Sequence, residues 1–127
     1  MLTCEAGLAR IVRSAQTLLV LHREIWIKHE VGMIRNFVIL KLRSDVRPDQ
    51  IDALLEAMGR LTVKGMSGLI VYRDAALRPG NCDVLVVCDL EDEEAYRRYD
   101  SDEEHNRIRR ELVAPMTERA ERIQVRF

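Results

Sequence analysis

The stretch IRNFVILKL, residues 34–42, is rich in β-branched and large apolar residues and predicts the first strand of the fold. Side chains alternate along a strand, so Asn36 and Val38 share one face while Phe37 and Ile39 share the other. Because both faces carry apolar residues, we expect both faces of this strand to be covered.

Working outward from this strand, the sequence alternates helical and strand patterns. Pro48 suits the first turn of a helix whose apolar residues recur at helical spacing as far as Leu61. Asp92 suits an N-cap, and Ser101 with Glu104 matches a capping box that would start a further helical segment. Three more strands are expected at residues 69–73, 83–90 and 121–127.

The predicted order β-α-β-β-α-β is that of an α+β, ferredoxin-like sandwich. Its sheet should be antiparallel, with both helices on one face. The other face would expose Phe37, Ile39 and part of the next two strands as an apolar patch. A homodimer that packs sheet against sheet covers this patch with one symmetric contact, so we expect a homodimer through the sheet face.

The first 32 residues differ from the domain expected at residues 33–127. Apolar residues recur there at roughly helical spacing and predict a helix over about residues 5–30. Such an extension is typical of a docking or membrane-surface helix. Alternatively, Met33 directly precedes the first strand and is the natural start, with residues 1–32 lying upstream of it.

Composition excludes several classes of function. A net charge of -1 and a pI near 6.3 argue against a nucleic-acid partner. No apolar run approaches the roughly 20 residues of a membrane span, and none suits a signal peptide. Cys4, Cys82 and Cys88 form no CxxC pair, which argues against a disulfide framework or a zinc site. We therefore expect a cytoplasmic protein that uses no metal and, lacking a P-loop or GxGxxG, no nucleotide or other cofactor.

Two further motifs, together with the first strand, resemble the motifs of a known family. Residues 33–42 look like the opening strand of the stress-responsive A/B barrel (Dabb) family, and residues 99–105, YDSDEEH, resemble its second signature, which usually reads Tyr-x-x-His-Pro-x-His. Residues 119–127 are similar to its closing strand. The resemblance covers nearly all of residues 33–127 and implies a dimeric α/β barrel with a cavity in each subunit.

The resemblance also implies a site. A plant member of the family is a polyketide cyclase that needs two histidines and a tyrosine around its cavity. Its tyrosine matches Tyr99 and its helix histidine matches His105, whereas its strand histidine falls on Asn36. Asp102 and Glu103 replace the His-Pro of the signature. Asn36 is neither an acid nor a base, although its amide donates and accepts hydrogen bonds.

His105 and Tyr99 are the candidate catalytic residues. An imidazole with a pKa near 6.5 transfers protons at neutral pH, and His105 shares the apolar face of its predicted helix with Ile108. The alternative is a core histidine bonded to a backbone carbonyl or to Tyr99. Five residues are candidates for binding a substrate, although ordinary packing also accounts for the two tyrosines among them: Asn36, Val38, Tyr72, Tyr96 and Ile108.

Three functions agree with these residues. The first is a protein whose small apolar cavity, with Asn36, Tyr99 and His105 as its polar points, binds a small apolar or aromatic molecule. The second is a cofactor-free, polyketide-cyclase-like or monooxygenase-like enzyme. The third is a non-catalytic structural or interaction module. Tyr99 and His105 favour the first two, while the lost strand histidine favours the first and third. The sequence leaves open whether a reaction is catalysed.

Overall fold

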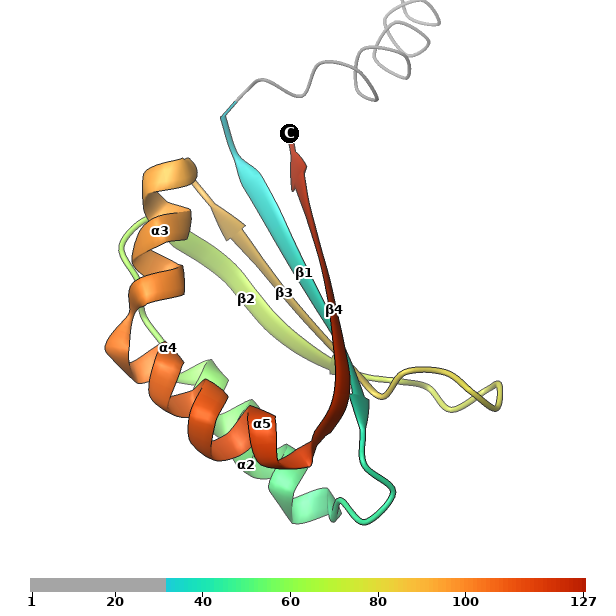
Figure 1. The fold of residues 1–127 in the computed structure, drawn as a ribbon. Coiled ribbons are helices and arrows are strands. Elements are labelled where there is room, and N and C mark those ends of the chain that lie inside the picture. The colour runs from blue at the N-terminus through green and yellow to red at the C-terminus, as the bar shows by residue number, and fades with distance from the viewer. Residues whose placement is uncertain (1–31) are drawn as a thin grey trace, which may run out of the picture.

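The structure is a computed structural model that describes residues 32–127; the helix expected over about residues 5–30 lies outside them. The described part is the predicted β-α-β-β-α-β arrangement (Figure 1). Its elements are β1 (Ile34–Leu42), α2 (Pro48–Gly59), β2 (Met66–Arg73), β3 (Val84–Leu90), α3 (Glu93–Ser101), α4 (Glu103–Ile108), the π-helical segment η1 (Arg109–Val113), α5 (Ala114–Met116) and β4 (Thr117–Arg126).

The four strands form one antiparallel sheet in the order β2-β3-β1-β4. The helices all lie on one side of it, as Figure 1 shows. This confirms the predicted ferredoxin-like topology. The predicted bounds of β1 are those observed, whereas β2 and β4 each begin several residues earlier than expected.

The alternation predicted for β1 decides which side chains meet the helices. Asn36 and Leu40 are buried beneath the helices, whereas Ile39 on the opposite face is 37% exposed. The neighbouring strand β3 repeats this pattern, with its alternate residues Val84, Val86, Cys88 and Leu90 buried. Helices α2 and α4 complete the core with fully buried side chains, among them Leu54 and Ile108.

The helical region after β3 differs from the prediction at one point. The Ser101 capping box is wrong: Ser101 is the last residue of α3, and its hydroxyl donates to the Arg97 carbonyl. Asp102 caps α4 instead, and its carboxylate accepts a hydrogen bond of 2.9 Å from the backbone N–H of His105. An aspartate is as good an N-cap as a serine, and choosing it moves the break between the two helices by one residue.

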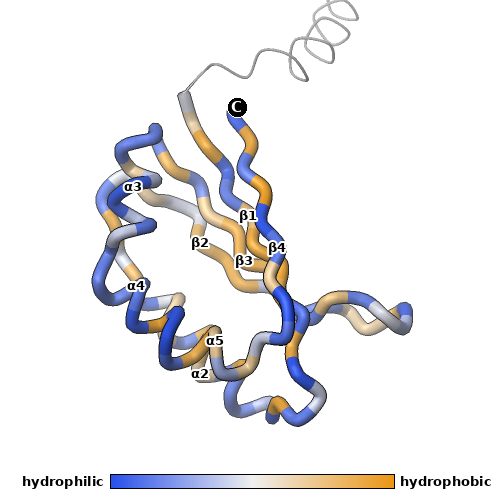
Figure 2. The backbone as a smooth tube through the Cα atoms, in the orientation of Figure 1, coloured by the Kyte–Doolittle hydropathy of each residue, from blue (hydrophilic) through white to orange (hydrophobic). Residues whose placement is uncertain are grey.

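The face of the sheet away from the helices carries a continuous set of partly exposed apolar residues. Figure 2 shows hydrophobic segments running along the strands. The exposed large apolar side chains on these strands are Ile39, Ile70, Tyr72, Ile123 and Val125, with Phe127 just beyond β4. No element within residues 32–127 covers this face, which we call the open sheet face.

Candidate functional site

A cavity of about 140 Å³ lies between the sheet and the helices. Strands β1, β3 and β4 form one wall, and helices α2, α3 and α4 with η1 form the other. Most of its lining is aliphatic, with a few polar groups among the apolar ones, which is the usual character of a small-molecule site. The lining residues are Val38, Leu40, Leu54, Met58, Val86, Tyr99, His105, Ile108, Arg109, Val113, Ala120 and Arg122.

His105 is a buried polar residue in the cavity wall, with 4% of its surface exposed. Its position follows from the Asp102 cap, which fixes the first turn of α4 and points the third helical residue toward the sheet. The His105 Nδ1 atom lies 2.8 Å from the backbone carbonyl oxygen of Tyr99. A carbonyl only accepts, so Nδ1 carries the proton in the neutral ring and Nε2 presents a lone pair. Within residues 32–127, Nε2 has no hydrogen-bond partner.

The His105 ring is held in its neutral form. Burial lowers its pKa, because the charged imidazolium loses hydration, and the nearby Arg109 guanidinium lowers this pKa further. The bond to the Tyr99 carbonyl and the carboxylates of Asp102 and Asp100 act in the opposite direction without prevailing. A neutral, buried imidazole with an unpartnered nitrogen can accept a hydrogen bond or a proton from a bound molecule.

Tyr99 stacks on His105, with ring centroids 4.0 Å apart and planes inclined by 31°. Its ring lines the cavity, but its hydroxyl interacts with the thiol of Cys88 on β3. Burial raises the pKa of the Tyr99 hydroxyl well above its ordinary value, so the group stays protonated. Tyr99 therefore orients the imidazole and supplies an aromatic wall.

Asn36 lies outside the cavity lining, in a polar cluster beside it. Its side-chain oxygen accepts a 3.0 Å hydrogen bond from the Gln124 amide on the adjacent strand β4. Burial raises the pKa of the neighbouring Cys88 thiol to about 11, although Tyr99 and Asn36 act to lower it. The partner that a buried amide requires is thus supplied by the protein.

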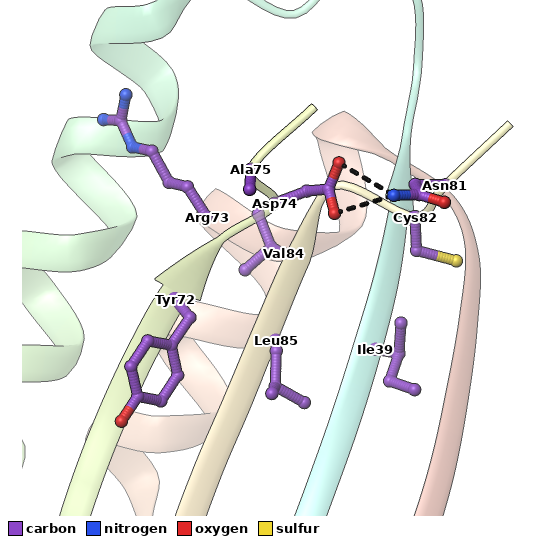
Figure 3. Close-up of a pocket in the computed structure, with 9 residues that line it drawn as sticks. All are labelled: Ile39, Tyr72, Arg73, Asp74, Ala75, Asn81, Cys82, Val84 and Leu85. Carbon is purple, nitrogen blue, oxygen red and sulfur yellow. Dashed lines mark hydrogen bonds between the residues drawn. The ribbon is translucent and has the colours of Figure 1, made fainter. Parts of the chain in front are cut away.

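The structure brings some of the predicted binding residues together and separates others. Val38 and Ile108 line the cavity with His105 and Tyr99. Tyr96 packs partly buried against the core without reaching the cavity. Tyr72 lies on the open sheet face, because it pairs with Leu85, whose side chain faces away from the helices. It lines a separate hollow of about 320 Å³ at the end of the sheet (Figure 3).

Two arginines in the cavity wall were not predicted from the sequence. Arg109 opens η1, and Arg122 stands opposite Val38 in the β1–β4 pairing. Side chains alternate along a strand, so the sequence indicates only that Arg122 faces away from Ile123. The sequence alone does not show which strand pairs with the last one. The pairing of Arg122 with Val38 is what places Arg122 at the cavity.

Metal-binding side chains do not gather in the part of the chain that the structure describes: no three of its histidines, cysteines and acids lie close enough to hold an ion. Among the same residues, no helix is long and apolar enough to span a membrane.

Solved structures of similar fold include proteins with and without an assigned reaction. A dimeric ferredoxin-like protein of unknown function from Thermobifida fusca is 25% identical, with a TM-score of 0.71, and the match covers 77% of this chain and 93% of that one. A Dabb family protein from Mesorhizobium loti is 20% identical, with a TM-score of 0.60 and coverage of 73% and 94%. The hydroxynitrile lyase of Passiflora edulis is 14% identical, with a TM-score of 0.67 and coverage of 76% and 94%.

No curated protein matches the chain. The family model described as the stress-responsive A/B barrel domain matches residues 34–125, which span all four strands and all the described helices. The sequence resemblance, the sheet order and this match agree: the chain belongs to the stress-responsive A/B barrel (Dabb) family.

Proposed function

We propose that this protein binds a small, largely apolar molecule in the cavity beside His105. One observation carries the proposal. The Nε2 atom of His105 is a buried acceptor without a protein partner, and it belongs to a ring that lines an aliphatic cavity. Leaving a buried polar atom unpaired costs about 1–3 kcal/mol, and a ligand hydroxyl would recover that free energy.

The cavity volume limits the ligand. An apolar cavity of about 150 Å³ accommodates benzene, so the 140 Å³ cavity suits one ring or a short branched chain. Phenol has such a ring and a hydroxyl that can donate to Nε2. Phenol is therefore a suitable probe for the class of ligand.

Binding of phenol is measured by following backbone amide shifts in NMR spectra during a titration. We expect saturable shifts among the residues that line the cavity. Ala120→Leu should abolish them, because the larger side chain fills the cavity from β4. Ala114→Leu is the matched control, since Ala114 lies exposed in α5 outside the cavity lining. Absence of saturable shifts in the wild-type protein, or equal binding by both variants, contradicts the proposal.

We also propose that two copies pair through the open sheet face. Its exposed apolar side chains lack any cover within residues 32–127, and the Thermobifida fusca relative is a dimer. A stable contact of this kind needs about 800 Å² from each partner. A second copy supplies a matching apolar face, as a two-fold axis requires.

The dimer is tested by sedimentation at micromolar concentration. The wild-type protein should sediment as a dimer, and Ile123→Glu, which places a charge on the open sheet face, should give a folded monomer. Glu111→Gln, on the helical side, serves as a control that changes one charge outside this face. A wild-type monomer refutes the proposed dimer and leaves the proposed cavity ligand untouched.

A second function, cofactor-free catalysis by proton transfer, is favoured by the neutral state of His105. The depressed pKa and the unpartnered Nε2 are properties of a general base. Hydroxynitrile cleavage, the activity named for the Passiflora edulis neighbour, is a suitable first assay. If the protein accelerates it, His105→Gln should remove the acceleration while leaving the fold intact; an equally active variant excludes His105 as the base.

A further inference from the structure

Arg122 is a charged cavity residue whose guanidinium has no acceptor within residues 32–127. It stands on β4, where its pairing with Val38 puts both side chains on the helix side of the sheet. Neither a hydrogen bond nor an ion pair joins its guanidinium to any residue of the described part. Its positive charge is therefore available to a ligand.

The other arginines nearby are already occupied. The Arg109 guanidinium also lines the cavity, but it donates to the Asp100 carboxylate at 3.0 Å and to the Asn106 side-chain oxygen at 2.8 Å. Arg126, further along the same face of β4, forms an ion pair with Glu93. Of these three arginines, Arg122 alone lines the cavity with its charge unneutralised.

No aspartate or glutamate lines the cavity, so no carboxylate in its wall neutralises the charge of Arg122. Arg122 and Arg109 both act to lower the pKa of the Tyr99 hydroxyl, although burial outweighs them. Because Arg109 is already paired with Asp100, a neutral ligand would leave only the charge of Arg122 without a counter-charge. An anion at the mouth of the cavity would neutralise the charge of Arg122, and the planar carboxylate group matches the planar guanidinium group.

We propose that the ligand is a small apolar carboxylate, with its apolar body in the cavity and its carboxylate held by Arg122. This inference rests on the proposed binding function and adds the charge of the ligand to it. Benzoate and benzamide are suitable probes, because they have the same ring and nearly the same shape, whereas only benzoate carries a negative charge and only benzamide has N–H donors.

The two probes are titrated separately into the full-length protein, and amide shifts of the cavity residues are followed by NMR. Benzoate should bind about tenfold more tightly than benzamide, as expected for one charge-assisted hydrogen-bonded contact. Arg122→Gln should abolish this preference by weakening benzoate alone. Arg110→Gln should keep it: Arg110 is exposed on η1, lies outside the cavity lining and has no ion-pair partner within the described residues.

The outcomes separate the two proposals. Equal binding of benzoate and benzamide by the wild-type protein overturns the inference about charge while leaving a small-molecule site in place. A preference for benzoate that survives Arg122→Gln overturns the role of Arg122. If neither probe nor phenol shifts the cavity residues, the proposed binding function fails and the inference fails with it.

Discussion

Lowering the pH from 7 to 5 should destabilise this protein through His105. In the folded state, burial depresses the pKa of the imidazole, whereas in the unfolded chain the same group titrates near 6.5. Below about pH 6.5 the unfolded chain therefore takes up a proton that the folded protein binds less readily. The stability contributed by neutral His105 is fully present above that pH, is lost as the pH falls, and stops changing below the folded-state pKa.

The size of the effect is bounded by linkage. One group that protonates only in the unfolded state changes the free energy of unfolding by at most about 1.4 kcal/mol per pH unit. The paired carboxylates do not interfere in this range. Arginine partners lower the pKa of Glu93 and Glu104, whose unfolded-state titration near 4.3 confines their effect to lower pH.

Urea unfolding at half-unit steps between pH 5 and pH 7, at one protein concentration, measures the slope. His105→Asn is the comparison, because its side-chain amide can still donate to the Tyr99 carbonyl but does not titrate. The wild-type protein should lose stability below pH 6.5, and the variant should change much less. Equal slopes, or a wild-type protein that becomes more stable as the pH falls, would refute the account of a neutral buried imidazole.

Three further predictions concern the surroundings of the cavity. In chemical denaturation, Gly65→Ala should destabilise the fold by more than the roughly 1–2 kcal/mol that a left-handed backbone costs a residue with a side chain. The added methyl group would lie only 2.8 Å from a carbon atom of α3. Gly80→Ala is the control: Gly80 also has a positive φ but lies in open space, so this variant should show only the backbone cost. In peptide mapping after iodoacetamide treatment at pH 8, buried Cys88, with a pKa of about 11, should stay unmodified until the protein unfolds, whereas partly exposed Cys82 should react. Asn36→Ala should lower the free energy of unfolding by about 1–3 kcal/mol yet leave the affinity for phenol in NMR titrations nearly unchanged, because Asn36 bonds to protein groups outside the cavity.

Local patterns were sufficient to predict the fold from the sequence. The β-branched and large apolar residues at 34–42 predicted the first strand with the bounds that β1 has in the structure. The open sheet face also followed from alternation alone, since Phe37 and Ile39 had to face away from Asn36 and Val38. The capping error at Ser101 shows the limit of such patterns, because two adjacent residues were both acceptable caps.

The candidate site was less predictable, because it depends on contacts between distant strands. His105, Val38 and Ile108 could be found from helix and strand faces, and Tyr99 from the resemblance to the family signature. Tyr72 could not be placed correctly, since β2 carries a bulge between Ser67 and Ile70 and shows no clean alternation of burial.

The same dependence on strand pairing explains the two remaining differences. Asn36 was expected at the cavity, but its register opposite Gln124 satisfies its amide within the sheet. Arg122 was not among the candidate residues, and only its register opposite Val38 shows that it lines the cavity. The register of two paired strands fixes which of their side chains are neighbours, and a local sequence pattern does not reveal that register.

The central claim is that the space beside His105 is a ligand site and not part of a closed core. A crystal structure of the protein grown with phenol tests it most directly. We expect density for one ring among the aliphatic residues of the cavity, with the phenol oxygen within hydrogen-bonding distance of His105 Nε2. The claim is contradicted if His105 Nε2 is bonded to a protein group and side chains fill the space that phenol would occupy.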